Sequence, residues 1–97
     1  MKPQVLNAHK VGTKSNNNRV YVGRPTKYGN RYIIGRDGTR QEVIDKYIKW
    51  FLEQSDDFLV NTIIELKGKD LICWCTPAAC HADFLLEIVN SIEFEEI

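Results

Sequence analysis

Apolar residues gather in four short runs that predict strands. Each run combines β-branched, aromatic or aliphatic residues and ends at glycine, proline or polar residues, which is typical of strands. The runs cover 4–8, 19–23, 31–35 and 70–75, and the run at 31–35 is predicted as a strand or an extended segment. The last run, which contains Leu71 and Ile72, has the nearly continuous apolar character of a buried strand.

Three stretches show the apolar spacing of helices. The first follows Thr39 and Glu42, which have the spacing of a capping box. The second begins after a cap at 55–57, and Gly68 is a suitable stop for it. The third is predicted to begin at 76–77, where a threonine cap precedes a proline in the first turn.

This order of elements predicts an α/β or α+β fold in one small layered domain. We expect a short mixed or parallel sheet packed by about three helices. The two helices between 19–23 and 70–75 would form a crossover, which favours parallel pairing of those strands. The chain of 97 residues has room for a single domain, 1–97, with one modest core, and 1–18 and 93–97 are expected to be peripheral.

The charges balance overall but are unevenly placed. There are 13 basic and 13 acidic side chains, and the zero net charge argues against nucleic-acid binding through a general basic field. The first forty residues nevertheless contain nine Lys or Arg and one acid, whereas the remainder contains four lysines and twelve acids. This asymmetry predicts an anion site in the basic part, or else pairing between the two parts within the fold.

Neither a membrane span nor a signal peptide is predicted. A spanning helix needs about 20 apolar residues, and no stretch of the sequence has them. The three cysteines are an odd number clustered within eight positions, unlike the even, dispersed set of a secreted disulfide framework. We therefore expect a reducing, cytoplasmic setting.

The cysteine cluster is the sharpest group of chemically active residues. Cys73 and Cys75 would share one face of their strand, and Cys80, His81 and Asp83 lie near the predicted helix start. A helix start and a nearby imidazolium both favour a reactive thiolate. Four interpretations stay open: a nucleophilic or redox cysteine, polar ligand contacts, a zinc site, or cysteines that only fill the core. The spacing is poor for zinc, so we predict no metal and no cofactor.

A second candidate is the loop after the strand at 19–23. Arg24 offers a planar fork for phosphate or carboxylate, and Lys27 adds a point charge. Gly29 and Asn30 would shape the loop so that backbone N–H groups approach an anion, and Tyr28 could stack on a base. The alternative is an ordinary basic surface loop with a Pro-Gly turn.

These segments together resemble a family of unknown function called DUF4326. The likeness covers about residues 19–90 and is carried by 19–25, 27–30, 34–40, 66–71, 73–75 and 80–83. Members are small proteins encoded by bacteriophages and bacteria, so the resemblance implies such an origin but no established activity. The family usually has Asn-Pro-Phe after the loop glycine, whereas here Asn30 precedes Arg31 and Tyr32, which keeps the aromatic and loses the proline.

We expect a small protein that binds a nucleotide or a related phosphorylated small molecule, and whether it also processes that ligand stays open. The predicted ligand-binding residues are Arg24, Lys27, Tyr28, Gly29, Asn30, Trp74 and Cys75, and the candidate catalytic residues are Cys80, His81 and Asp83. The alternative is a non-enzymatic module that contacts a host protein or nucleic acid through its basic N-terminal part. The oligomeric state, including a homodimer, stays open.

Overall fold

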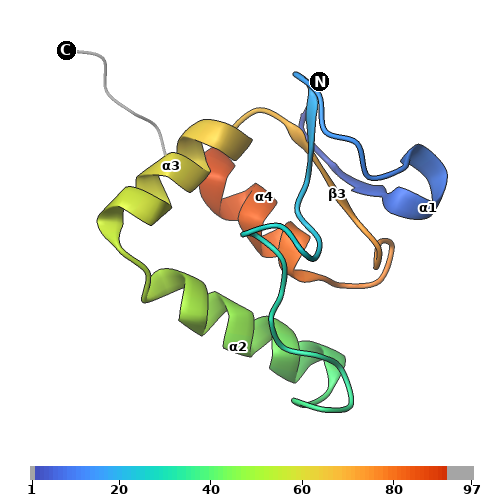
Figure 1. The fold of residues 1–97 in the computed structure, drawn as a ribbon, viewed down its shortest axis with the longest axis vertical. Helices are drawn as coiled ribbons and strands as arrows, with labels where there is room; N and C mark the ends of the chain where they lie inside the picture. The colour runs from blue at the N-terminus through green and yellow to red at the C-terminus, as the bar shows by residue number, and fades with distance from the viewer. Residues whose placement is uncertain (1, 92–97) are drawn as a thin grey trace.

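The computed structural model describes residues 2–91, which form a three-stranded sheet and four helices (Figure 1). Strands and helices alternate irregularly, so the predicted mixed α/β class is confirmed. The elements are β1 Val5–Asn7, α1 Ala8–Val11, β2 Arg19–Tyr21, α2 Arg40–Leu52, α3 Asp56–Leu66, β3 Asp70–Cys73 and α4 His81–Ser91.

The sheet is parallel and has the strand order β1-β3-β2. The predicted parallel pairing of the strands around Val20 and Leu71 is confirmed, with α2 and α3 in the connection between them. Leu71 also pairs with Val5 of β1, so β3 has a neighbour on each side. This central place explains why Leu71 and Ile72 are completely buried.

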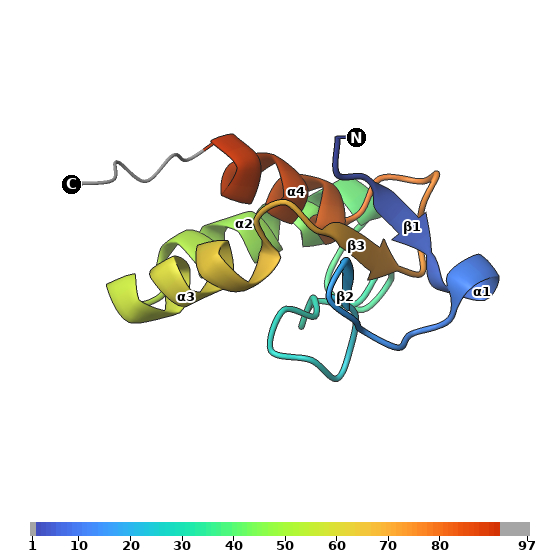
Figure 2. The ribbon, with the colours of Figure 1, turned by 90° about the horizontal axis from the view of Figure 1, so that it is seen from above.

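The helix α4 lies between the sheet and the other two long helices. It contacts β1 and β3 on one side and α2 and α3 on the other (Figure 2). Its buried residues Leu85 and Val89 therefore meet Leu71 from the sheet and Phe51 and Leu66 from the outer helices in one hydrophobic core. None of the described helices has the length and apolar character needed to cross a membrane.

The predicted starts of α2 and α3 are correct. The Thr39 hydroxyl accepts the Glu42 N–H (3.2 Å) and the Glu42 carboxylate accepts the Thr39 N–H (3.0 Å), which completes the capping box. The Ser55 hydroxyl likewise accepts the Phe58 N–H at the start of α3. Gly68 follows the end of α3 with φ of +79°, a conformation that favours glycine.

Of the two alternatives predicted for 31–35, a strand or an extended segment, the strand is wrong. This segment is a loop in which Ile34 makes only an isolated bridge to Gly38. The Asp37 carboxylate accepts the Ile33 N–H (2.8 Å), and the Asp37 N–H donates to the Ile33 carbonyl (2.8 Å). These local bonds close a turn and occupy backbone groups that a strand would have used for pairing.

Other elements also differ from the predictions, and the strands predicted at 4–8 and 19–23 are limited to Val5–Asn7 and Arg19–Tyr21. The strand at 70–75 ends at Cys73, so Trp74 and Cys75 lie beyond it and strand alternation does not determine their faces. The last helix begins at His81 rather than at 76–77, because a turn closed by the Ala78 N–H and the Cys75 carbonyl precedes it. The one-turn helix α1, capped by Asn7, was not predicted. The tail at 93–97 lies outside the described residues.

Candidate ligand-binding site

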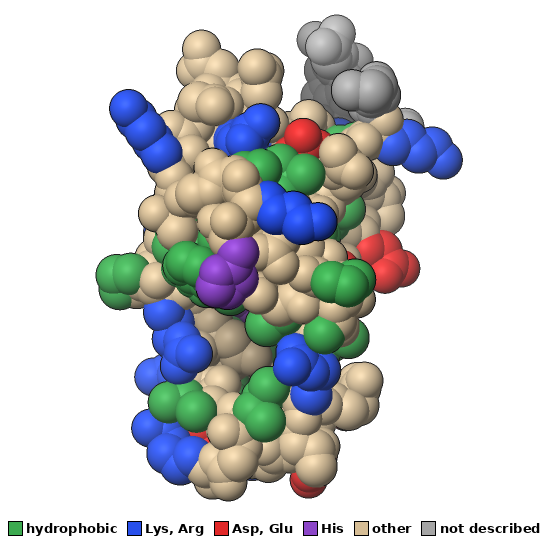
Figure 3. All heavy atoms as spheres, turned by 90° about the vertical axis from the view of Figure 1, so that its right-hand side faces the viewer, with side chains coloured by type: hydrophobic (Ala, Val, Ile, Leu, Met, Phe, Trp, Pro, Cys, Tyr) green, Lys and Arg blue, Asp and Glu red, His purple; other side chains and the backbone are tan. Residues whose placement is uncertain are grey.

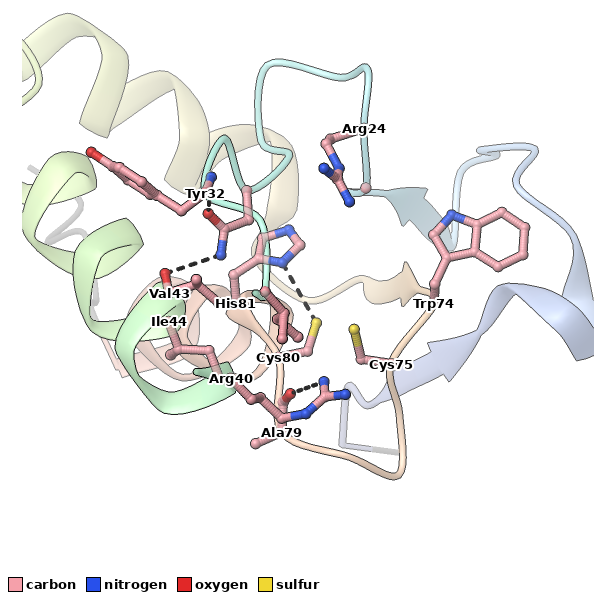
Figure 4. Close-up of a pocket in the computed structure, with 13 residues that line it drawn as sticks. Arg24, Tyr32, Arg40, Val43, Ile44, Trp74, Cys75, Ala79, Cys80 and His81 are labelled. Atoms are coloured by element: carbon pink, nitrogen blue, oxygen red, sulfur yellow. Dashed lines mark hydrogen bonds between the residues drawn. The ribbon is translucent and has the colours of Figure 1, made fainter. Parts of the chain in front are cut away.

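A pocket of about 110 Å³ lies where β2 and β3 end, beside the first turns of α2 and α4 (Figure 4). In parallel sheets this carboxyl edge of the strands is where ligands usually bind. The two segments singled out in the sequence, the loop after β2 and the Cys-His pair, both contribute to the wall of the pocket. The lining residues are Gly23, Arg24, Asn30, Tyr32, Ile34, Arg40, Val43, Ile44, Trp74, Cys75, Ala79, Cys80 and His81.

The residues that line the pocket include two arginines and no acid. Arg24 and Arg40 lie on opposite sides of it, and none of the thirteen lining residues is Asp or Glu (Figure 4). Arg40 donates to the Ala79 carbonyl (3.0 Å), whereas the Arg24 side chain makes no hydrogen bond or ion pair with residues 2–91. A pair of guanidinium groups in such surroundings attracts phosphate or carboxylate.

Basic side chains also dominate the outer surface on the sheet side of the molecule. On the face shown in Figure 3, Lys and Arg side chains are more frequent than Asp and Glu. The uneven charge along the sequence is therefore visible in space. Some cations of the chain are nevertheless paired. Arg36, for example, lies 2.8 Å from the Asp37 carboxylate.

Trp74 stands at the rim of the pocket with 47% of its surface exposed. Its indole N–H donates to the Tyr21 hydroxyl (2.8 Å), which donates in turn to the Arg24 carbonyl (2.7 Å). The His9 ring of α1 meets the indole edge-on, with 4.8 Å between ring centroids. These contacts fix an exposed aromatic ring beside Arg24, as a platform for a planar ligand requires.

Gly23 has no side chain, so the Tyr21 ring can lie against its backbone and hold Trp74 in place. A Cβ atom at position 23 would lie 2.4 Å from the Tyr21 hydroxyl oxygen. Any larger residue would therefore push away the ring that holds Trp74. His9 and Tyr21 were not predicted as site residues, because neither the short helix α1 nor the contact between these rings has a signal in the sequence.

His81 is buried at the inner wall of the pocket with a defined orientation. Its Nε2 lies 2.8 Å from the Val22 carbonyl oxygen, and its Nδ1 lies 3.5 Å from the Cys80 sulfur. A carbonyl only accepts hydrogen bonds, so Nε2 carries the hydrogen and Nδ1 of the neutral ring is an acceptor. Burial, assisted by the charge of Arg24, lowers the pKa of His81 and keeps the ring neutral.

Cys80 immediately precedes α4 and takes part in its capping. The Ala82 N–H donates to the Cys80 sulfur (3.3 Å), and the Asp83 carboxylate accepts the Cys80 N–H (3.0 Å). A hydrogen bond with the Cys73 thiol, together with burial, raises the pKa of Cys80. Asp83 does not line the pocket, so its geometry makes it a support for Cys80 rather than a ligand contact.

The three cysteines occupy different environments. Cys73 is buried in the core, Cys75 is partly exposed and Cys80 is only 4% exposed, and all three thiols are free. In Figure 4 the side chains of Cys75 and Cys80 point in the same direction, toward the side of the pocket where Arg24 lies. Within residues 2–91, no group of three or more His, Cys, Asp or Glu side chains has an arrangement that could hold a metal ion.

The residues of the predicted loop divide into two groups. Arg24 and Asn30 line the pocket, and the Asn30 side chain joins the Val43 carbonyl to the Tyr32 N–H. Lys27 and Tyr28 instead turn away from it toward α3, where both side chains bind the Glu65 carboxylate.

Gly29 is needed inside the loop but does not line the pocket. A Cβ atom at position 29 would lie only 2.9 Å from the Arg24 backbone nitrogen.

Sequence reasoning also missed several lining residues. Arg40 belonged to a segment that carried the family resemblance, and Tyr32 is the aromatic that this sequence keeps after the loop glycine, so these two could have been found. The other five missed positions are Gly23, Ile34, Val43, Ile44 and Ala79.

Comparison with known proteins gives relatives but no activity. The chain matches the family described as "Domain of unknown function (DUF4326)" over residues 5–91. It is 33% identical over 76 residues to an uncharacterised 12.4 kDa protein of enterobacteria phage T4, with 75% of this chain and 68% of the relative covered. It is 30% identical over 92 residues to an uncharacterised protein of Acanthamoeba polyphaga mimivirus, with coverages of 76% and 68%. No solved structure matches.

Proposed function

The chain belongs to the DUF4326 family, and we propose that it binds a nucleotide or a related phosphorylated small molecule in the pocket between Arg24 and the start of α4. The observation that carries this proposal is the pair of arginines on opposite sides of a pocket without acidic lining. Among residues 2–91 the Arg24 side chain has no partner, so a bound anion can pair with it without breaking a salt bridge to any of these residues.

The phosphate would lie between the two guanidinium groups. Arg24 is free to form a bidentate pair with it, and Arg40 is oriented by the Ala79 carbonyl. Gly23 lies in the same wall of the pocket and has no side chain, so its backbone is open to the phosphate. Charge-assisted hydrogen bonds of this kind contribute about 1.5–3 kcal/mol each, so the two arginines would supply a large part of the affinity.

The base or another planar group would stack on Trp74. The ring is already held by Tyr21 and His9, so little conformational freedom is lost when a ligand covers it. The pocket volume of about 110 Å³ is small compared with the roughly 300–1,000 Å³ of pockets that enclose a whole drug-sized ligand. One part of the ligand therefore enters the pocket and the remainder lies on the exposed rim.

The experiment is a thermal-shift screen with nucleoside mono-, di- and triphosphates, sugar phosphates and inorganic phosphate, followed by calorimetric titration. A ligand at about 100 times its Kd stabilises the fold by about 2.7 kcal/mol. For a domain of this size that raises the Tm by roughly 10 °C or more. If no member of the panel raises the Tm, the proposal is wrong.

A matched pair of variants locates the site. Arg24→Ala should weaken binding about tenfold or more and leave the fold intact, because its side chain makes no hydrogen bond or ion pair within residues 2–91. Lys27→Ala removes the same charge three residues away, where the cation is already paired with Glu65, and should leave the Kd unchanged. Equal losses in both variants would show a diffuse charge effect and contradict a site at Arg24.

A further inference from the structure

The Cys80 thiol and the His81 imidazole are two chemically active groups of the pocket that simple binding does not need. We propose that Cys80 is a nucleophile and His81 its general base, acting on an electrophilic carbon of the bound anion. This inference deepens the proposed function and rests on it for the identity of the ligand. The substrate class is an anionic, phosphorylated compound whose reactive carbon lies close to the group held by the arginines.

The orientation of His81 is that of a base in a thiol–imidazole pair. The hydrogen on Nε2 is committed to the Val22 carbonyl at 2.8 Å, which leaves the lone pair of Nδ1 directed at the Cys80 sulfur at 3.5 Å. Nucleophile–base pairs also need a third group that orients the base, and here the Val22 carbonyl orients the His81 ring. A histidine that only filled the core would not need this orientation. Here the Nδ1 atom of His81 faces the thiol of Cys80, the residue that caps α4 beside the pocket.

The surroundings of Cys80 suit a sulfur that becomes charged during a reaction. The Ala82 N–H already donates to the sulfur at 3.3 Å, and the sulfur lies at the positive end of α4. At rest the thiol keeps its proton, because its hydrogen bond with Cys73 and its burial raise its pKa. A base is therefore needed to remove that proton, and the Nδ1 atom of His81 is in contact with the sulfur that carries it.

The reaction is a hydrolysis in two displacements. His81 Nδ1 takes the thiol proton while the sulfur forms a bond to the carbon, and the leaving group departs with the electron pair of its broken bond and receives that proton. Water then attacks the same carbon and gives its proton to His81. The thiolate leaves with the electron pair of the sulfur–carbon bond and regains its proton from His81.

Competitive alkylation of the folded protein tests the pair without a known substrate. Iodoacetamide is added in limiting amount, and the modified cysteines are identified by peptide mass spectrometry. Exposure alone predicts that Cys75, which is partly exposed, reacts before Cys80, which is 4% exposed. An activated thiol predicts the reverse order, with Cys80 modified first and this preference lost when the protein is unfolded in urea.

The His81→Gln variant is the matched control, because glutamine can still donate to the Val22 carbonyl but offers no basic nitrogen to the thiol. We expect its Cys80 alkylation to slow by about 100-fold, the lower end of what a positioned base contributes, with the rate at Cys75 unchanged. Modification of Cys75 before Cys80 in the native protein overturns the proposal, and this result needs no variant to fold. An unchanged Cys80 rate in folded His81→Gln overturns it as well.

Failure of this inference is distinguishable from failure of the proposed function. Iodoacetamide is neutral, so its order of reaction reports the thiol–imidazole pair and not the anion site. Protection of Cys80 by a nucleotide that raises the Tm supports both proposals, since the ligand then covers the sulfur. Slow, unselective alkylation together with nucleotide binding overturns the nucleophile alone, whereas fast Cys80 alkylation with no Tm shift from any nucleotide overturns the proposed ligand class alone.

Discussion

Arg24 and Lys27 are three residues apart in one loop, but their environments are opposite. Lys27 lies 3.1 Å from the Glu65 carboxylate of α3, in an exposed ion pair next to Tyr28. Arg24 faces the pocket, and its side chain has no hydrogen-bonding or ionic partner among residues 2–91. The comparison shows that a run of cations in a sequence does not identify an anion site, since an acid on a distant element can already occupy one of them.

The same division extends to the aromatic residues near each cation. Tyr28 is 3% exposed, its hydroxyl donates to Glu65, and its carbonyl accepts the Tyr47 hydroxyl (2.8 Å). Trp74 is 47% exposed and is held only at its edges. One part of the loop therefore anchors the domain, and the other part borders a surface that a ligand can reach.

The largest expected effect is on the anchoring side. Tyr28→Ala removes a buried ring that contacts Phe58 and belongs to the core, and such truncations cost about 3–5 kcal/mol. Arg24→Ala should change the free energy of unfolding by less than about 0.5 kcal/mol. Urea denaturation followed by circular dichroism compares the two. A destabilisation by Arg24→Ala as large as that by Tyr28→Ala would show that both cations belong to the scaffold.

The next effect concerns the exposed ring. Trp74→Ala should weaken nucleotide binding by about 1–3 kcal/mol, the contribution of one stacked base, with little change in stability. The protein has two tryptophans, so Trp50→Phe is the matched control and should keep the affinity. Calorimetric titration gives both Kd values, and Trp74 fluorescence in the Trp50 variant should be altered by the ligand. Equal affinities in the native protein and Trp74→Ala would remove Trp74 from the site.

The sequence predicted those parts of the fold that local patterns determine. The capping box at Thr39, the serine cap of α3 and the buried central strand all follow from neighbouring residues, and the parallel pairing follows from the crossover. The segment 31–35 has the same β-branched character as a strand, but the Asp37 carboxylate binds the Ile33 backbone and makes a turn instead. The Asp37 carboxylate and a neighbouring strand compete for the same backbone N–H of Ile33. The sequence alone does not show whether a neighbouring strand is within reach, so it does not show which of the two binds.

The candidate site was predicted only as far as residue types indicate chemistry. Arg24, Trp74 and the Cys80–His81 pair were singled out, and the structure brings them to one pocket. Arg40 was not predicted as a site residue, because its contact with Ala79 joins residues 39 positions apart. Lys27 and Tyr28 were assigned to the ligand because nothing in the sequence shows that Glu65 is within their reach.

The pocket side also predicts a dependence of stability on pH. Burial and the charge of Arg24 lower the pKa of His81, whereas in the unfolded chain a histidine titrates near about 6.5. The unfolded state therefore binds the proton first, so this contribution to stability is complete above about pH 6.5 and is lost as the pH falls toward the lower native pKa.

Chemical denaturation between about pH 5 and 8 measures this contribution. In the native protein the free energy of unfolding should rise with pH from about pH 5 to about 6.5 and level off above that, and His81→Gln should show a shallower rise. Tyr28→Phe, on the anchoring side, should keep the native slope. The same slope in His81→Gln as in the native protein would mean that His81 is equally protonated in the folded and unfolded states, contrary to its buried contact with Val22.

The smallest expected effect belongs to Lys27, and it is the most direct test of the comparison. Its side chain and that of Glu65 are 55% and 45% exposed, and exposed ion pairs contribute about 0–1 kcal/mol because water screens them. Lys27→Ala should therefore alter the free energy of unfolding by less than about 1 kcal/mol and leave nucleotide affinity unchanged, as measured by urea denaturation and calorimetric titration. A tenfold loss of affinity in Lys27→Ala would mean that the ligand replaces Glu65 as the partner of this lysine, and the loop would then have two cations for the ligand rather than one.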